Sequence, residues 1–257
     1  MEYSPILAVA TAVFEVIVAG WVLAFRPRGT AAGETGCRIG LSDRRAIART
    51  TGAILLLLAG YQITEVVICA DVGAAGFLPR LAFLVVTWLP ALGILLIAQL
   101  RRPTSRILYG SALAMLVAAA GIVTWIVVDR SFATASVCNA VFARYAHVQP
   151  RFQLYAGYYW LGLLAMIALS TYGVFTSTDL HRRRLLSHVQ AGTLGFVVPS
   201  ILTSLFVPTA QGALPSIMCH FALILAIFLA RMVWVLRAGP AREGTEADSM
   251  RPESQEA

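Results

Sequence analysis

Three ionisable side chains, Glu15, Glu65 and His220, lie well inside long apolar stretches of the sequence. A charged group near the centre of a membrane costs about 2.5–3.5 kcal/mol on insertion scales, so such groups usually face a bundle interior and serve a function. From the helical rise of about 1.5 Å per residue, Glu65 and His220 should share one level in the outer half of the membrane. We therefore predict that they meet in a polar pocket open to the outside.

Hydroxyl, amide and phenol side chains would surround Glu65 and His220 in this pocket. Gln62 lies three residues before Glu65 and Ser216 lies four residues before His220, so each pair shares a helix face. The hydroxyls of Thr203 and Ser204 on the sixth apolar stretch, and the phenol of Tyr158 at the start of the fifth, would also line the pocket. The predicted ligand-binding residues are Glu65, His220, Gln62, Ser216, Thr203, Ser204 and Tyr158.

Simpler interpretations stay open at several of these positions. Glu65 and His220 could form an interhelical hydrogen bond that only fixes packing, worth about 0.6 kcal/mol on average in membrane bundles. Tyr158 could belong to an aromatic belt at the membrane interface, which needs no ligand. Glu15 lies nearer the midplane, where burial favours an uncharged carboxyl, and we assign it a proton-linked role.

The four cysteines have no C-x-x-C spacing, which argues against a thiolate metal cluster. Cys37 falls in a cytoplasmic loop as a free thiol. Cys69 and Cys138 both fall on the outer side, where the surroundings are oxidising. We expect a Cys69–Cys138 disulfide, with Cys219 as the rival partner.

Enzymatic chemistry finds little support in these residues. A zinc site made of Glu65, Cys219 and His220 is poor, because adjacent helical residues diverge by about 100°. A Ser216 nucleophile with His220 as its base lacks an aspartate to orient the ring. Since all 20 basic residues are arginine, lysine-dependent chemistry is excluded. We expect no metal and no cofactor, and keep a membrane-embedded metal-dependent hydrolase as the enzymatic alternative.

Three prolines mark the helices that would carry the pocket. Pro90 and Pro199 each remove one backbone hydrogen bond inside an apolar stretch, which predicts a kink or hinge. Pro215 lies in the first turn of the last stretch, a normal helix start. The positive end of that helix dipole would point at the outer mouth and suit a carboxylate or another anion.

Helices that span a membrane are expected to position these candidate site residues. Of the 257 residues, 58% are apolar and 13% are charged, and the mean hydropathy is +0.75, a composition that a water-soluble surface cannot accommodate. Several stretches reach about 20 residues, the length of helix that crosses the hydrocarbon core. We predict an all-α integral membrane protein, a seven-transmembrane helix bundle over residues 1–237. The expected spans are about 5–25, 46–70, 77–100, 106–128, 154–177, 189–209 and 214–237.

Arginine placement predicts the orientation of this bundle. Sixteen of the 20 arginines fall on one side of the arrangement and four on the other, so the N-terminus is expected outside and the C-terminus in the cytoplasm. The net charge of +7 follows from these flanking arginines and does not indicate nucleic-acid binding. The polar, acidic residues 238–257 are predicted to form a disordered cytoplasmic tail.

The pattern as a whole predicts a multi-pass protein of a bacterial plasma (inner) membrane that binds or transports a small molecule. The long connection 129–153 is expected to fold over the pocket as a lid, with a merely solvated loop as the alternative. As a sensor, the chain would need a cytoplasmic partner protein. As a transporter, it would move the small molecule across the lipid bilayer. A structural subunit without its own ligand is a further alternative.

Overall fold

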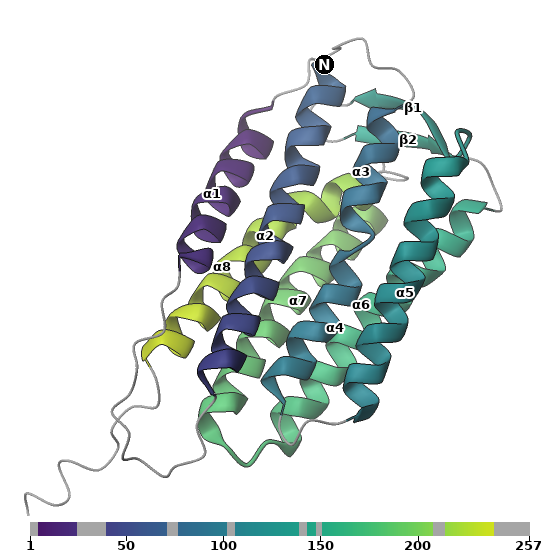
Figure 1. Cartoon of the computed structure of the whole chain (residues 1–257). Coiled ribbons are helices and arrows are strands. Elements are labelled where there is room, and N and C mark those ends of the chain that lie inside the picture. Colours follow the sequence, from purple (N-terminus) through teal and green to yellow (C-terminus); the bar gives the residue numbers. More distant parts are fainter. Residues whose placement is uncertain are drawn as a thin grey trace, which may run out of the picture.

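Seven helices of the computed structural model are long and apolar enough to cross a membrane, as expected for a multi-pass membrane protein (Figure 1). Residues 5–24, 40–70, 77–101, 106–138, 143–147, 151–207 and 214–238 are described. The predicted tail beyond residue 238 and Cys37 lie outside them. The helices are α1 (Ile6–Leu23), α2 (Leu41–Cys69), α3 (Leu78–Val86) with α4 (Leu89–Leu100), α5 (Arg106–Val128), α6 (Arg151–Thr176), α7 (Leu180–Phe206) and α8 (Leu214–Ala238).

Some helices begin earlier than the apolar stretches indicate. The α7 helix starts at Leu180 rather than at 189, because Asp179 caps it: the Asp179 carboxylate accepts hydrogen bonds from the backbone N–H groups of His181 and Arg182 at 2.9 and 3.5 Å. The Arg182 side chain also pairs with Asp179 at 3.1 Å. In the same way α2 begins at Leu41 rather than at 46. A search for long apolar stretches misses such helical turns, since polar residues also form helix beyond the hydrocarbon core of a membrane.

Pro90 divides the third span into α3 and α4. Without an N–H group, Pro90 cannot continue the hydrogen-bond ladder, and the helix is interrupted at Thr87 and Trp88. The Thr87 hydroxyl donates to the Phe83 carbonyl at 2.6 Å. The Tyr158 hydroxyl, on α6, donates to the Thr87 carbonyl at 2.8 Å. By contrast, Pro199 lies inside an uninterrupted α7.

The close approach of α6 to this break gives a stability prediction. A Cβ atom at Gly162 would overlap the Cβ of Pro90, whereas one at Gly157, on the same helix, would meet nothing within 4 Å. We expect Gly162→Ala to lower the free energy of unfolding by about 1–3 kcal/mol through overpacking. The matched Gly157→Ala variant should leave it unchanged or raise it slightly, because alanine favours helix. Unfolding of both variants in detergent micelles measures the difference, and equal stabilities would contradict this packing.

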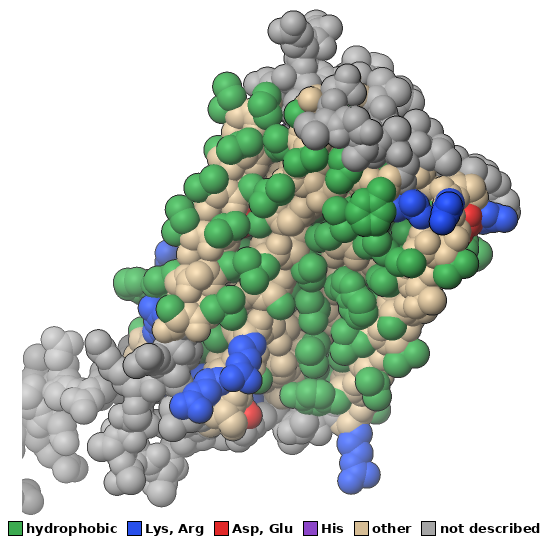
Figure 2. Space-filling view, turned by 45° about the horizontal axis from the view of Figure 1, so that its top comes forward, with side chains coloured by type: hydrophobic (Ala, Val, Ile, Leu, Met, Phe, Trp, Pro, Cys, Tyr) green, Lys and Arg blue, Asp and Glu red, His purple; other side chains and the backbone are tan. Residues whose placement is uncertain are grey.

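The helices bury one side and present apolar side chains on the other. The α1 helix packs on α2 and α8, while α7 packs on α8 and α6. On α1 the buried stripe runs through Thr11, Glu15 and Val18, and large apolar residues such as Ile17 stay exposed. Figure 2 shows apolar side chains along the middle of one face, with arginines toward its ends. Such a surface suits contact with lipid.

A short antiparallel hairpin, which the sequence analysis did not predict, packs at one end of the bundle (Figure 1). Its strands are β1 (Ala133–Cys138) and β2 (Ala143–His147), and Cys138 pairs with Ala143 beside the connection. Strand β1 contacts α3 and α2. We call this end of the bundle the hairpin end and the opposite one, where α2 and α7 begin, the arginine-rich end.

Aromatic rings attach the hairpin to the helices. Phe83 on α3 lies at their centre and makes edge contacts with Phe132, Tyr145, Phe152 and Tyr155, at centroid distances between 5.2 and 5.8 Å. These rings belong to α3, to the hairpin region and to α6. Edge-to-face pairs of this kind add to the stabilisation that comes from burial itself.

Candidate functional site

Glu65 lies at the centre of a polar cluster beneath the hairpin. The Ser216 hydroxyl, in the first turn of α8, donates a hydrogen bond to Glu65 Oε1 and accepts one from the backbone N–H of Ala143 at 3.1 Å. Ser216 therefore links α2, α8 and β2. Both Glu65 and Ser216 have 0% relative exposure. The Glu65 carboxyl thus lies at the positive end of the α8 dipole, a place that attracts negative charge.

Gln62 extends this cluster by one turn of α2. Its side-chain amide donates to the backbone carbonyl of Cys219, and the residue is fully buried. Two oxygens of the cluster, Gln62 Oε1 and Glu65 Oε2, are buried and have no hydrogen-bond partner among the described residues. Unpartnered buried acceptors are rare and costly in proteins. We use the name polar cluster for Gln62, Glu65, Ser216 and His220.

His220 completes the polar cluster from α8. Its Nδ1–H group donates to the Ser216 carbonyl at 2.8 Å, which leaves Nε2 for other contacts, and the side chain is half-buried. The Ser216 hydroxyl is directed to Glu65 rather than to His220, so a serine nucleophile with a histidine base is not assembled. No group of three metal-ligating side chains occurs within the described residues.

The hairpin closes over the polar cluster through three contacts. The backbone of Ala143 reaches Ser216, as described above. The Tyr61 hydroxyl donates to the Tyr145 hydroxyl at 3.2 Å. A disulfide joins Cys69, one turn beyond Glu65, to Cys138 at the end of β1, with a Cα–Cα distance of 5.7 Å. Cys219, the rival partner, is a buried free thiol. The site is thus closed rather than open to the outside.

An ion pair holds the connection between α5 and the hairpin. Arg151 Nη1 lies 2.6 Å from Asp129 Oδ2, and Asp129 Oδ1 accepts from the hydroxyl and the backbone N–H of Ser131 at 2.6 and 3.0 Å. The Ser131 hydroxyl bond, helped by Arg151, lowers the pKa of Asp129 below its ordinary value. The carboxylate therefore stays charged and fixes the segment that leads into β1.

Glu15 approaches the same region from α1. It is fully buried, and neither of its carboxyl oxygens has a hydrogen-bond partner in the described part of the chain. Glu15 and Glu65 both interact electrostatically with the Cys219 sulfur. The two acids of the membrane interior therefore border the same stretch of α8.

Three predicted ligand-binding residues form no hydrogen bond with the polar cluster within the described part of the chain. Tyr158 bonds to the Thr87 carbonyl at the break between α3 and α4. Thr203 and Ser204 are half-buried near the end of α7. Over the residues that the structure describes, their hydroxyls form no hydrogen bond with Glu65 or His220. Residue type alone did not show which way these helices face.

Two contact residues were missed from the sequence. Tyr61 precedes Glu65 by four residues on the same face of α2, so its spacing carried a signal that could have included it. Tyr145 offered no such signal, because its position depends on a hairpin that has no clear strand pattern in the sequence.

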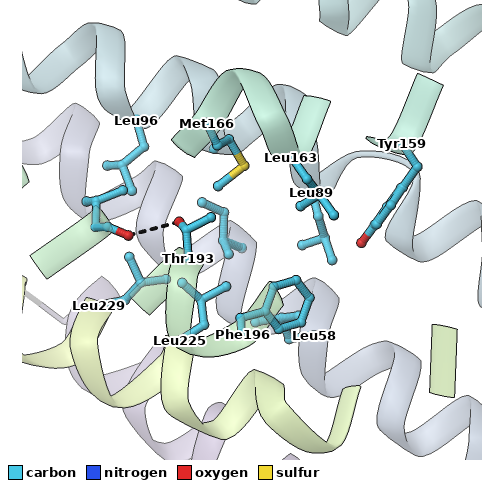
Figure 3. Close-up of a pocket in the computed structure, with 13 residues that line it drawn as sticks. Leu58, Leu89, Leu96, Tyr159, Leu163, Met166, Thr193, Phe196, Leu225 and Leu229 are labelled. Carbon is cyan, nitrogen blue, oxygen red and sulfur yellow. Dashed lines mark hydrogen bonds between the residues drawn. The ribbon is translucent and has the colours of Figure 1, made fainter. Parts of the chain in front are cut away.

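An apolar layer lies between the polar cluster and the arginine-rich end. Figure 3 shows the layer, in which Leu58, Leu89, Phe196 and Leu225 surround a cavity of about 20 Å³. The hydroxyl of Thr193, which also lines the cavity, donates a hydrogen bond to the Val189 carbonyl at 2.8 Å. An apolar cavity of this size stays dry. The polar cluster therefore does not continue into this layer.

A comparison with models of known protein families and with curated protein sequences finds no match.

Proposed function

We propose that this multi-pass membrane protein binds a small molecule at the polar cluster and that the hairpin is the lid of the site. The observation that carries this proposal is the buried Glu65 carboxyl, which has an unpartnered oxygen directly beneath a tethered hairpin. A buried carboxyl that only fixed packing would be expected to use both oxygens. A ligand that enters the cluster would satisfy the second one.

Some residues hold both the hairpin and the polar cluster, which supports a coupling between hairpin movement and ligand binding. Ser216 holds both the Glu65 carboxyl and the backbone of Ala143, and Tyr61, next to Gln62, holds Tyr145. A molecule that displaced Ser216 from either partner would loosen β2. Binding and hairpin movement are therefore expected to accompany each other, while the Cys69–Cys138 bond keeps the hairpin attached.

The orientation we propose places the hairpin end outside the cell. The arginine excess at the opposite end favours a cytoplasmic location for that end, and a disulfide at the hairpin end suits an oxidising compartment. The N-terminus is then outside and the C-terminus in the cytoplasm of a bacterial plasma (inner) membrane. The ligand would reach the site from the outside.

A sensor is the form of this function that we favour. The apolar layer around Leu58, Phe196 and Leu225 separates the polar cluster from the arginine-rich end, which disfavours a continuous polar path in this conformation. A sensor would pass the state of the hairpin through the helices to a cytoplasmic partner protein. Glu15, buried beside the same part of α8, would have a proton-linked role in that change.

A transporter is the second candidate, because the third span is broken. Discontinuous helices often form the substrate sites of transporters, and the Thr87 carbonyl at the break accepts a bond from Tyr158 on another helix. A hinge at Pro90 would let α3 and the hairpin move relative to α4. The enzyme and structural-subunit alternatives have no comparable observation in their favour.

Native mass spectrometry of the gently solubilised full chain tests the proposal. Wild type should retain a small molecule that is lost in Glu65→Gln, which keeps an acceptor for Ser216, and in Gln62→Leu. The matched control is Gln99→Leu: Gln99 also has a buried, unpartnered amide oxygen but bonds to Thr50 on another part of the bundle. Retention by all four proteins, or by none, would contradict a site at the polar cluster.

Proteoliposomes that contain the purified protein separate the two candidates. A transporter should move the retained molecule across the bilayer, and Glu65→Gln should abolish that movement. A sensor should bind the molecule without moving it. Flux that persists in Glu65→Gln would place the transport path elsewhere.

A further inference from the structure

We propose that the ligand of the polar cluster carries a small, positively charged group that donates hydrogen bonds, as a protonated amine does. This inference rests on the proposed function and names the chemical class of its ligand. It follows from the kind of atoms that the site leaves without partners, from their charge and from the space around them.

The unpartnered atoms of the site are oxygens, which are hydrogen-bond acceptors when the carboxyls are ionised. Within the described residues they are Gln62 Oε1 and Glu65 Oε2, together with both carboxyl oxygens of the neighbouring Glu15. A ligand with acceptors of its own would leave these oxygens unsatisfied. A ligand with N–H donors would satisfy them, so the site selects for donors.

Most donors of the site are already used. Gln62 donates its amide to the Cys219 carbonyl, Ser216 donates its hydroxyl to Glu65, and His220 donates from Nδ1 to the Ser216 carbonyl. Tyr61 donates to Tyr145. An anionic ligand would find the second N–H of the Gln62 amide but would meet the Glu65 carboxyl as well.

The charge of the site also favours a cationic ligand. Glu15 and Glu65 are acids with no exposed surface, and His220 is the basic side chain that acts on Glu65. No arginine pairs with either acid in the described part of the chain. A cation that binds beside Glu65 would be attracted to its carboxylate, and in a region of low dielectric this attraction is strong.

The burial of the site favours a small charged group on the ligand. Gln62, Glu65 and Ser216 have 0% relative exposure, and Ala143 covers Ser216 directly. The phenol rings of Tyr61 and Tyr145, whose hydroxyls are 3.2 Å apart, bound it on the hairpin side.

Thermal unfolding of the full-length protein in detergent micelles, at constant ionic strength, tests the class with four probes. Methylammonium carries positive charge and N–H donors, and tetramethylammonium carries the charge without donors. Formamide carries N–H donors and a carbonyl without net charge, and formate carries negative charge. A probe that binds the native state raises the unfolding midpoint. We expect methylammonium to raise it most, tetramethylammonium less, and the other two not at all.

Variants test whether the binding of methylammonium depends on the polar cluster. Glu65→Gln should raise the Kd for methylammonium about thirtyfold or more, as expected when a buried charge partner is removed. Gln62→Leu should also weaken binding, and Gln99→Leu should bind as wild type does. Circular dichroism of each variant before titration checks that it is folded.

The other outcomes are equally decisive. An equal response to tetramethylammonium would overturn the requirement for donors, and a Glu65-dependent response to formate or formamide would overturn the cationic class while leaving the proposed function intact. If the midpoint follows pH but not methylammonium, protons satisfy the carboxyls and the inference fails. A response to none of the four, together with no retained molecule in the mass spectra, would remove the proposed function as well.

Discussion

Replacing Phe83 by alanine should lower the free energy of unfolding by about 3–5 kcal/mol, the usual cost of removing a buried phenylalanine. The side chain is 1% exposed and is the ring around which Phe132, Tyr145 and Tyr155 pack. Its loss would leave a cavity where α3, the hairpin and α6 meet. Unfolding in detergent micelles, followed by tryptophan fluorescence, measures the change.

Phe77→Ala is the matched control for this variant. Phe77 precedes α3 by one residue and is 56% exposed, so its truncation should change stability little. The Phe83 variant should also release the hairpin, which faster proteolysis between α5 and α6 would report. Equal stability of the two variants would contradict the packing of the hairpin on α3.

Removing the disulfide should have the second largest effect. In the double variant Cys69→Ser with Cys138→Ser, the free energy of unfolding should fall by about 2–4 kcal/mol, because the bond closes a long segment of chain and so restricts the unfolded state. The two cysteines are separated by 69 positions in the sequence. A reductant should have a similar effect on wild type and none on the double variant.

Cys219→Ala provides the control, because the Cys219 thiol is free and buried. This variant should keep its sensitivity to the reductant. Peptide mapping under non-reducing conditions should recover Cys69 linked to Cys138. Recovery of a Cys69–Cys219 peptide would show that the alternative pairing forms and that the hairpin is not tethered.

Several features followed from the sequence because their causes are local. Continuous apolar stretches of membrane-spanning length are a property of consecutive residues, and the described part of the chain contains seven such helices. The rise per residue placed Glu65 and His220 at one level, and Ser216, one turn from His220, does contact Glu65. Pro90 lacks an N–H group and so predicted a disturbance of its span, and the helix is interrupted beside it, whereas α7 continues through Pro199.

Other features depended on how the helices turn and pack. A helix in a membrane can rotate about its axis without changing its span, so the sequence could not show that Tyr158 bonds to the Thr87 carbonyl rather than reaching Glu65. Because α7 can rotate in the same way, the sequence also could not show which way Thr203 and Ser204 face. The start of α7 at Leu180 was hidden because the Asp179 cap extends the helix through charged residues.

What the sequence determined by itself was therefore the number of membrane-length helices within the described residues, and the shared helix faces of Gln62 with Glu65 and of Ser216 with His220. What the tertiary structure decided was the closure of the polar cluster. The hairpin exists because distant groups hold it: Phe83 from α3, Ser216 from α8, and Cys69 from α2. Contacts between residues far apart in the chain leave no periodic signal in the sequence, so only the assembled bundle reveals that Glu65 is covered.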